Sequence, residues 1–130
     1  MQITALSQHR TEEVQQLMSL GSPHITARTL SDYWLYARLF SSTCPIALLE
    51  GAVIGSAIAM RSQDDPADVY VQDVMTHPDH RRNGVAAALL NVVRQRAQRW
   101  TCRRASADGS TQISRERPGH LTCTDVRPPK

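Results

Sequence analysis

The alternation of apolar and polar residues divides the first hundred residues into strands and helices. Met1–Leu6 alternates weakly and is compatible with a first strand. Apolar residues then recur at helical spacing from about Thr11 to Leu20, which predicts a helix with Glu12 and Glu13 in its first turn, where negative charge is favourable. Gly21-Ser22-Pro23 ends this helix, because such residues stop helical periodicity.

A second helix is predicted to begin after Thr29. Asp32 follows Thr29 at the three-residue spacing of a capping box, in which two side chains bond reciprocally to the free backbone groups of a helix start. The predicted apolar stripe of this helix consists of Leu30, Tyr33, Trp34, Ala37 and Phe40. For Tyr33 and Trp34 the pattern favours packing in the core over contact with a ligand.

Two apolar runs of β character follow, Cys44–Glu50 and Ala52–Met60, and they predict a hairpin turning at Glu50-Gly51. The polar stretch Ser62–Asp68 contains a proline and is predicted to be a loop. Val69–Thr76 is the next predicted strand.

After a short connection, His77–Asn83, the strongest helical pattern of the chain runs from Gly84 to Trp100. Beyond Trp100 the periodicity stops. Residues 101–130 have isolated apolar residues among Arg, Ser, Thr, Gly and Pro, which is typical of a poorly structured segment, although Cys102–Ala107 is compatible with a short strand. We therefore predict one domain over residues 1–100 and a basic tail over 101–130.

The composition agrees with a single domain, since 130 residues with 41% hydrophobic content can bury one core. The chain has no apolar run of 18 residues and no signal-like amino terminus, so we expect a cytoplasmic protein without a membrane partner. Three cysteines without metal-site spacing predict reduced thiols, with neither a disulfide framework nor a metal site.

The formal net charge of +3 comes entirely from the last thirty residues. Residues 1–100 contain nine Arg and nine Asp or Glu, whereas residues 101–130 contain six Lys or Arg against three acids. This basic excess lacks interleaved aromatic residues, so no nucleic-acid partner is predicted.

Candidate chemistry lies between the predicted strand at 69–76 and the helix that begins at 84. Here a strand leads into a basic turn, a glycine and small residues, and then an amphipathic helix. The first N–H groups of a helix lack internal partners and lie at the positive end of its dipole, so they bind anions. Gly84 and Ala86 leave room for a phosphate to approach, and Arg81 and Arg82 add positive charge.

In this context Arg81-x-x-Gly84-x-Ala86 resembles the Gln/Arg-x-x-Gly-x-Gly/Ala signature of the GNAT acyltransferases. The predicted order of elements over residues 1–100 also resembles that family. The resemblance implies an α+β fold, an α/β sandwich with a mixed, mostly antiparallel sheet flanked by helices, here without the last family elements. It also implies acetyl-coenzyme A (acetyl-CoA) as co-substrate.

The resemblance further implies which residues hold this co-substrate. The strand before the signature pairs its backbone with the pantetheine arm in the family, which assigns Val74, Met75 and Thr76. The turn and the first helical residues hold the pyrophosphate. This assigns Arg81, Arg82, Asn83, Gly84, Val85, Ala86 and Ala87.

Catalysis of acyl transfer to an amine needs a base for the ammonium and an acid for the departing thiolate. Many family members carry a carboxylate base on the strand before the signature, and Asp73 is the nearest match. A solvent-facing or loop-bonding aspartate is the alternative for Asp73, and Tyr70 is a weaker candidate on the same strand.

The segment after Trp100 departs from the family pattern. Family members continue with a strand, a helix that opens with Asn and carries a tyrosine acid, and a hairpin, whereas residues 101–130 contain neither Tyr nor Asn. A truncated or frame-shifted product would explain this, and completion by a partner subunit is the other interpretation. The predicted function is therefore acetyl-CoA-dependent N-acetylation of a small-molecule or peptide amine with weak activity. A non-catalytic CoA-binding fragment is the alternative, and a homodimer is left open.

Overall fold

The computed structural model describes residues 1–65, 68–101, 112–117 and 120–124 of the chain. The strands are β1 (Gln2–Ala5), β2 (Pro45–Leu49), β3 (Ala52–Arg61), β4 (Asp68–Thr76), β5 (Gln112–Arg117) and β6 (His120–Thr124). The α-helices are α1 (Thr11–Ser19), α2 (Leu30–Leu39) and α3 (Val85–Thr101). Three short 3-10 helices complete the description: η1 (Gln8–Arg10), η2 (Ser41–Thr43) and η3 (Pro78–His80).

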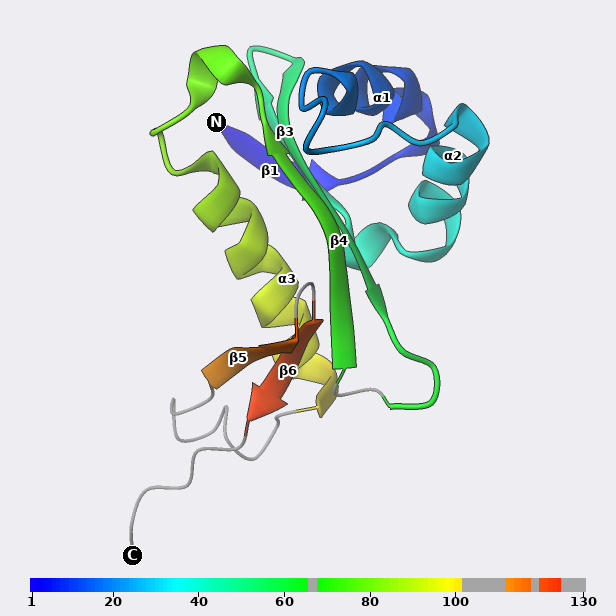
Figure 1. The fold of residues 1–130 in the computed structure, drawn as a ribbon, viewed down its shortest axis with the longest axis vertical. Helices are drawn as coiled ribbons and strands as arrows, with labels where there is room; N and C mark the ends of the chain where they lie inside the picture. The colour runs from blue at the N-terminus through cyan, green and yellow to red at the C-terminus, as the bar shows by residue number, and fades with distance from the viewer. Residues whose placement is uncertain (66–67, 102–111, 118–119, 125–130) are drawn as a thin grey trace, which may run out of the picture.

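The described strands form one antiparallel sheet in the order β1-β2-β3-β4-β6-β5 (Figure 1). The predicted hairpin between β2 and β3 is confirmed, and its two turn residues, Glu50 and Gly51, both have positive φ (52° and 81°). This is the geometry that a two-residue turn needs to match the twist of its strands. The predicted α+β class, with a mostly antiparallel sheet flanked by helices, is confirmed.

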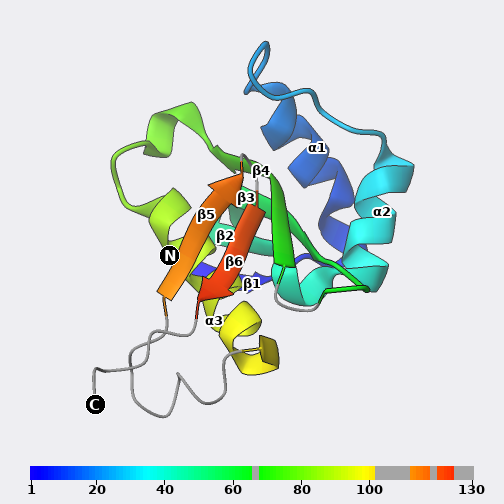
Figure 2. The ribbon, with the colours of Figure 1, turned by 60° about the horizontal axis from the view of Figure 1, so that its bottom comes forward.

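Helices cover both faces of the sheet, with α1 and α2 on one side and α3 on the other (Figures 1 and 2). The core on the α1 and α2 side contains the large buried residues Leu6, Leu17, Met18, Tyr33, Ile46, Ile58 and Met75. The core on the α3 side is built from smaller residues, namely Ala47, Ala57, Ala59, Val69, Val71, Val85, Leu89, Val93 and Ala97, with Ile54.

Small side chains bring the start of α3 close to β3. A Cβ atom added to Gly55 would lie 2.5 Å from Val85 Cγ1 and 3.1 Å from Leu89 Cδ1, so the helix occupies the space that a side chain would need. The close approach therefore fixes the first turn of α3 against the sheet, next to the end of β4.

The start of α2 follows the sequence pattern. The Thr29 side chain accepts a hydrogen bond from the Asp32 N–H at 3.1 Å, and the Asp32 carboxylate accepts one from the Thr29 N–H at 3.3 Å, so the capping box is confirmed. Tyr33 is fully buried as predicted. The prediction of core packing is wrong for Trp34, whose side chain is 47% exposed. Trp34 lies about 100° further around the helix than Tyr33 and therefore faces away from the core.

The segment after α3 contains two strands where the sequence pattern predicts none. β5 and β6 form a hairpin, and β6 pairs with β4 at Asp68–Tyr70. Strand pairing of this kind uses backbone groups and needs no strong apolar periodicity, which explains why the pattern does not reveal it. The strand considered at Cys102–Ala107 lies outside the described residues, and the domain boundary at residue 100 stays a prediction.

The described residues offer neither a membrane-spanning helix nor a cluster of metal ligands. None of the described helices is long and apolar enough to cross a lipid bilayer. Within the described ranges, no group of three or more His, Cys, Asp or Glu side chains is placed to hold a metal ion.

Candidate functional site

A bulge in β4 changes which side of the sheet its residues face. Asp73 pairs with Ile58 and Val71 pairs with Ala59, so Gln72 is an extra residue in β4. Val71 and Val74 contact the core beneath α3, whereas Met75 belongs to the core beneath α1 and α2. The bulge therefore shifts the alternation of β4 by one position and places Gln72 and Asp73 toward α2.

The second edge of β4 is only partly paired. β6 pairs with β4 at Asp68–Tyr70 alone, so within the described strands residues 71–76 have β3 as their one neighbour. Half of the backbone N–H and C=O groups of an unpaired edge point outward and can hydrogen-bond an extended ligand. The open edge ends where α3 begins.

A cavity of about 420 Å³ lies at this junction. Its walls come from the loop between α1 and α2, the end of β4 and the start of α3. The lining residues are Gly21, His24, Ile25, Val74, Met75, Thr76, Arg81, Arg82, Gly84, Val85, Ala86 and Ala87.

Nine of the ten residues predicted for the co-substrate thus line one cavity. The tenth, Asn83, is exposed and does not line it, and neither does Asp73. This placement brings the candidates together, and their role in binding stays a prediction.

The start of α3 has the properties of an anion site. The Gly84 carbonyl accepts a hydrogen bond from the Ala88 N–H at 3.0 Å, and the N–H groups of residues 85–87 precede the first such bond of the helix. Gly84 has a φ of +75°, which glycine adopts without strain, and no atom lies within 4 Å of the position that a Cβ would take. No acidic residue stands in the first turn.

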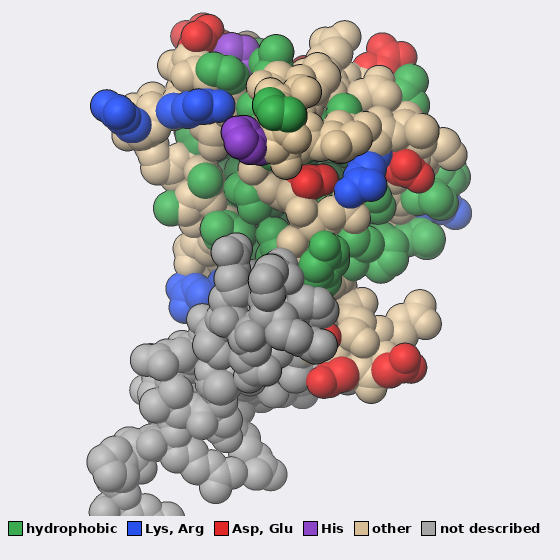
Figure 3. Space-filling model, in the orientation of Figure 1, with side chains coloured by type: hydrophobic (Ala, Val, Ile, Leu, Met, Phe, Trp, Pro, Cys, Tyr) green, Lys and Arg blue, Asp and Glu red, His purple; other side chains and the backbone are tan. Residues whose placement is uncertain are grey.

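Basic side chains surround this helix start. Arg81 and Arg82 are exposed, and Arg82 has a φ of 69°, which is uncommon for a residue with a side chain. On the face in Figure 3, basic and histidine side chains lie along the connection between β4 and α3, and the acidic side chain of Asp79 in η3 belongs to the same connection. A phosphate at the free N–H groups would therefore meet a positive helix end and positive side chains.

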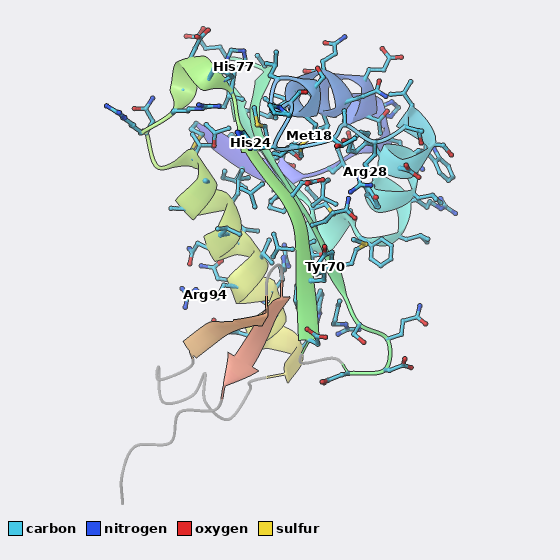
Figure 4. All side chains as sticks on the ribbon, in the orientation of Figure 1. Met18, His24, Arg28, Tyr70, His77 and Arg94 are labelled. Atoms are coloured by element: carbon cyan, nitrogen blue, oxygen red, sulfur yellow. The ribbon has the colours of Figure 1, made fainter. Side chains whose placement is uncertain are left out.

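One wall of the cavity has no counterpart in the predicted site. Gly21, His24 and Ile25 come from the loop between α1 and α2, and His24 lies beside β4 in Figure 4. A Cβ on Gly21 would be 3.0 Å from Ile25 Cβ and 3.1 Å from Met75 Sδ, so this loop packs tightly against β4. The only signal in the sequence is the glycine itself, which the pattern explains equally well as the end of a helix.

Asp73 lies in a second group of polar residues, between β4 and α2. The Gln72 Nε2 group lies 3.4 Å from Asp73 Oδ2 and 3.2 Å from Tyr36 Oη, and it donates to both. The rings of Tyr36 and Tyr33 meet edge to face with centroids 5.9 Å apart. Asp73 is therefore linked to α2 through hydrogen bonds, and is not a solvent-facing residue without partners.

The pKa of Tyr33 is raised, mainly because the side chain is buried. The Tyr33 hydroxyl accepts a hydrogen bond from the Arg28 N–H at 3.0 Å. The negative charge of Asp73 raises this pKa further, which places the carboxylate within electrostatic reach of the ring. Tyr70, the weaker candidate, is 39% exposed on the same strand, and its role stays a prediction.

Cys44 is not a candidate nucleophile. Its side chain is buried, and burial raises the pKa of its thiol to about 12, while the S–H group donates to the Ala59 carbonyl oxygen at 3.4 Å. The thiolate is the reactive form of cysteine, so this residue stays inert at neutral pH.

Comparison with known proteins identifies the family. Residues 11–116 match the model of the acetyltransferase (GNAT) family, so the chain belongs to this family, as the signature predicts. No curated protein sequence matches the chain.

Several solved structures share the fold. Diaminobutyrate acetyltransferase EctA from Paenibacillus lautus, in complex with L-2,4-diaminobutyric acid and coenzyme A, has a TM-score of 0.67 at 21% identity, covering 94% of this chain and 92% of that one. Naa20 from Chaetomium thermophilum, in complex with a bisubstrate analogue, has a TM-score of 0.67 at 14% identity, covering 95% and 84%. The ribosomal-protein-alanine N-acetyltransferase from Brucella melitensis biovar Abortus 2308 has a TM-score of 0.60 at 19% identity, covering 78% and 74%.

Proposed function

We propose that this chain is an acetyl-CoA-dependent N-acetyltransferase with a small-molecule or peptide amine as acceptor. The observation that carries the proposal is the cavity at the end of β4. It combines an unpaired strand edge, the free N–H groups of α3 and two arginines in one place. Family membership supports the same activity, since GNAT proteins are acetyltransferases.

The described residues fit a ligand that has an amide-containing arm and a pyrophosphate. The N–H groups of residues 85–87 would hold the pyrophosphate, with Arg81, Arg82 and Asn83 beside it. The outward backbone groups of Val74, Met75 and Thr76 would pair with the pantetheine amides. When bound, acetyl-CoA supplies an acetyl thioester as the activated group.

We propose Asp73 as the base that accepts a proton from the acceptor ammonium, directly or through a water molecule. Its carboxylate follows the bulge and immediately precedes the strand residues assigned to the pantetheine arm. The structure of EctA supports an amine acceptor, because it has the same fold and holds its substrate L-2,4-diaminobutyric acid together with coenzyme A.

A non-catalytic CoA-binding domain is the second candidate, and one observation favours it. Residues 101–130 contain no tyrosine, the residue that the family resemblance implies as the acid for the departing thiolate. Loss of one proton-transfer group lowers a rate by about 10²–10⁴-fold. We therefore expect acetyl transfer by this chain to be slow even where acetyl-CoA binds.

Calorimetry with CoA and thiol release from acetyl-CoA with a panel of amines test the proposal together. Saturable binding with slow, amine-dependent thiol release is the expected result. Binding without release for any amine would favour the second candidate. A turnover number near the enzyme median of about 10 s⁻¹ would show that an acid is present after all.

A further inference from the structure

Two side chains, Gln72 and Tyr36, connect the proposed base to the buried ring of Tyr33 in α2. Tyr33 is fully buried and packs edge to face against Tyr36. Tyr36 Oη accepts a hydrogen bond from Gln72 Nε2, and the same nitrogen donates to Asp73 Oδ2. A continuous series of contacts therefore runs from a buried ring to the Asp73 carboxylate.

The chemistry of the Gln72 amide fixes the direction of these bonds. Its Nε2 carries two hydrogens, one for each partner, and it has no acceptor capacity. The reversed amide would place its carbonyl oxygen against a carboxylate, which is repulsive. Because Tyr36 accepts from Gln72, the hydroxyl hydrogen of Tyr36 points away from that bond.

The geometry leaves one carboxylate oxygen of Asp73 available. Oδ2 accepts from Gln72 at 3.4 Å, and no described residue donates a hydrogen bond to Oδ1. The bulge is essential, since it places the neighbouring residues Gln72 and Asp73 on the same side of β4, where α2 carries Tyr36.

We propose that Gln72 and Tyr36 are positioning residues, which hold the Asp73 carboxylate in one orientation with Oδ1 directed to the acceptor amine. The role of Asp73 as base rests on the proposed function. Its orientation does not, and can be measured without turnover. In this arrangement α2, which contains no signature residue, helps to orient the Asp73 carboxylate on β4 through Tyr36.

The kinetic test uses three variants. Gln72→Met keeps the length of the side chain and removes both hydrogen bonds, and Tyr36→Phe removes one and keeps the ring. A hydrogen bond to a charged group contributes about 1.5 kcal/mol, so we expect kcat to fall about tenfold in Gln72→Met and less in Tyr36→Phe, with the KM for acetyl-CoA unchanged. Tyr33→Phe is the matched control, because it loses a hydroxyl from the adjacent ring without touching Gln72.

The same variants have a spectroscopic test that needs no activity. The side-chain amide resonance of Gln72 should move in Asp73→Asn and in Tyr36→Phe and stay in place in Tyr33→Phe. An unmoved Gln72 resonance in Asp73→Asn would overturn the proposal, and so would an equal loss of kcat in Tyr33→Phe and Tyr36→Phe. If the resonance moves as expected but the wild-type chain acetylates no amine, the orientation stands and the proposed function is refuted.

Discussion

The cavity at the end of β4 and the polar group around Asp73 differ in origin. In the cavity, the start of α3 and the strand before it supply nine of the lining residues within fourteen positions of sequence, Val74 to Ala87, and the loop between α1 and α2 supplies the other wall. In the polar group, Gln72 links Asp73 to Tyr36 of α2, which precedes Gln72 by 36 residues. Most of the cavity lining is therefore local in the sequence, whereas folding brings Asp73 and α2 together.

The two faces of the sheet differ in the size of the residues that form their cores. Small residues on the α3 side let the helix approach β3 closely, which a phosphate-binding helix start needs for a fixed position. Large residues on the other side, such as Tyr33, form a core from which polar side chains reach β4. The close approach of α3 holds one wall of the cavity in place, and the core beneath α1 and α2 holds the polar group around Asp73.

The largest effect is expected at Gly84. Gly84→Glu places a negative side chain where the phosphates would bind, so CoA affinity should fall by roughly 100-fold or more in calorimetry. Gly51→Glu is the matched control, because Gly51 also has a positive φ and open space around its Cβ position and does not line the cavity. Equal affinity in a folded Gly84→Glu variant would refute the site.

Asp73→Asn should separate the roles of the cavity and of the polar group around Asp73. We expect kcat to fall by about 100-fold, because the amide cannot accept the proton, while calorimetry shows nearly unchanged CoA affinity. Asp79→Asn makes the same substitution at an exposed aspartate outside both sites and should leave kcat unchanged. A weakened CoA affinity in Asp73→Asn would mean that Asp73 also takes part in binding the co-substrate.

Gly55→Ala tests the close packing of α3. The added Cβ would lie 2.5 Å from Val85 Cγ1, so the helix start must shift, and overpacking of this kind costs about 1–3 kcal/mol in the free energy of unfolding. Denaturant unfolding measures the loss. The double variant with Val85→Ala removes the clashing methyl group and should recover part of it, whereas a fully stable single variant would show that α3 is loosely packed.

The smallest effect concerns Cys44 on the α1 and α2 side. Its pKa is about 12 in the folded chain against 9.0 ordinarily, so the folded state keeps the thiol proton after the unfolded state has lost it. This contribution to stability is complete below pH 9 and falls by about 1.4 kcal/mol per pH unit between pH 9 and 12.

Unfolding in urea at pH 8 and pH 10 measures this loss, and Cys44→Ala isolates it. The alanine variant should be less stable at pH 8, because it leaves a small cavity, but should lose less stability on going to pH 10. An identical pH dependence in both proteins would show that the Cys44 thiol ionises without cost in the folded state.

The cavity residues from β4 and α3 could be predicted from the sequence because they are neighbours along the chain. The glycine at position 84, the helical periodicity after it and the strand before it predict a strand, a turn and a helix start, and local geometry then brings these residues together. Capping at Thr29 and the hairpin at Glu50 are confirmed for the same reason, since each depends on a few adjacent residues.

The remaining features depend on contacts between distant segments. Gln72 is an unremarkable residue in an alternating strand, and only the bulge turns it toward Tyr36. The packing of Gly21 against Met75 depends on how the loop after α1 folds onto β4, which the sequence pattern does not indicate. β5 and β6 lack a strong apolar pattern, and they join the sheet through backbone pairing of β6 with the first residues of β4.

Backbone NMR of the chain titrated with CoA distinguishes binding along the end of β4 and at the start of α3 from binding elsewhere. We expect the amide resonances of Val85, Ala86 and Ala87 to move most, with those of Val74–Thr76 next. Resonances on the outer surface of α2, such as Trp34, should stay in place. Saturable CoA binding that leaves the amides of residues 85–87 unmoved would contradict this binding mode.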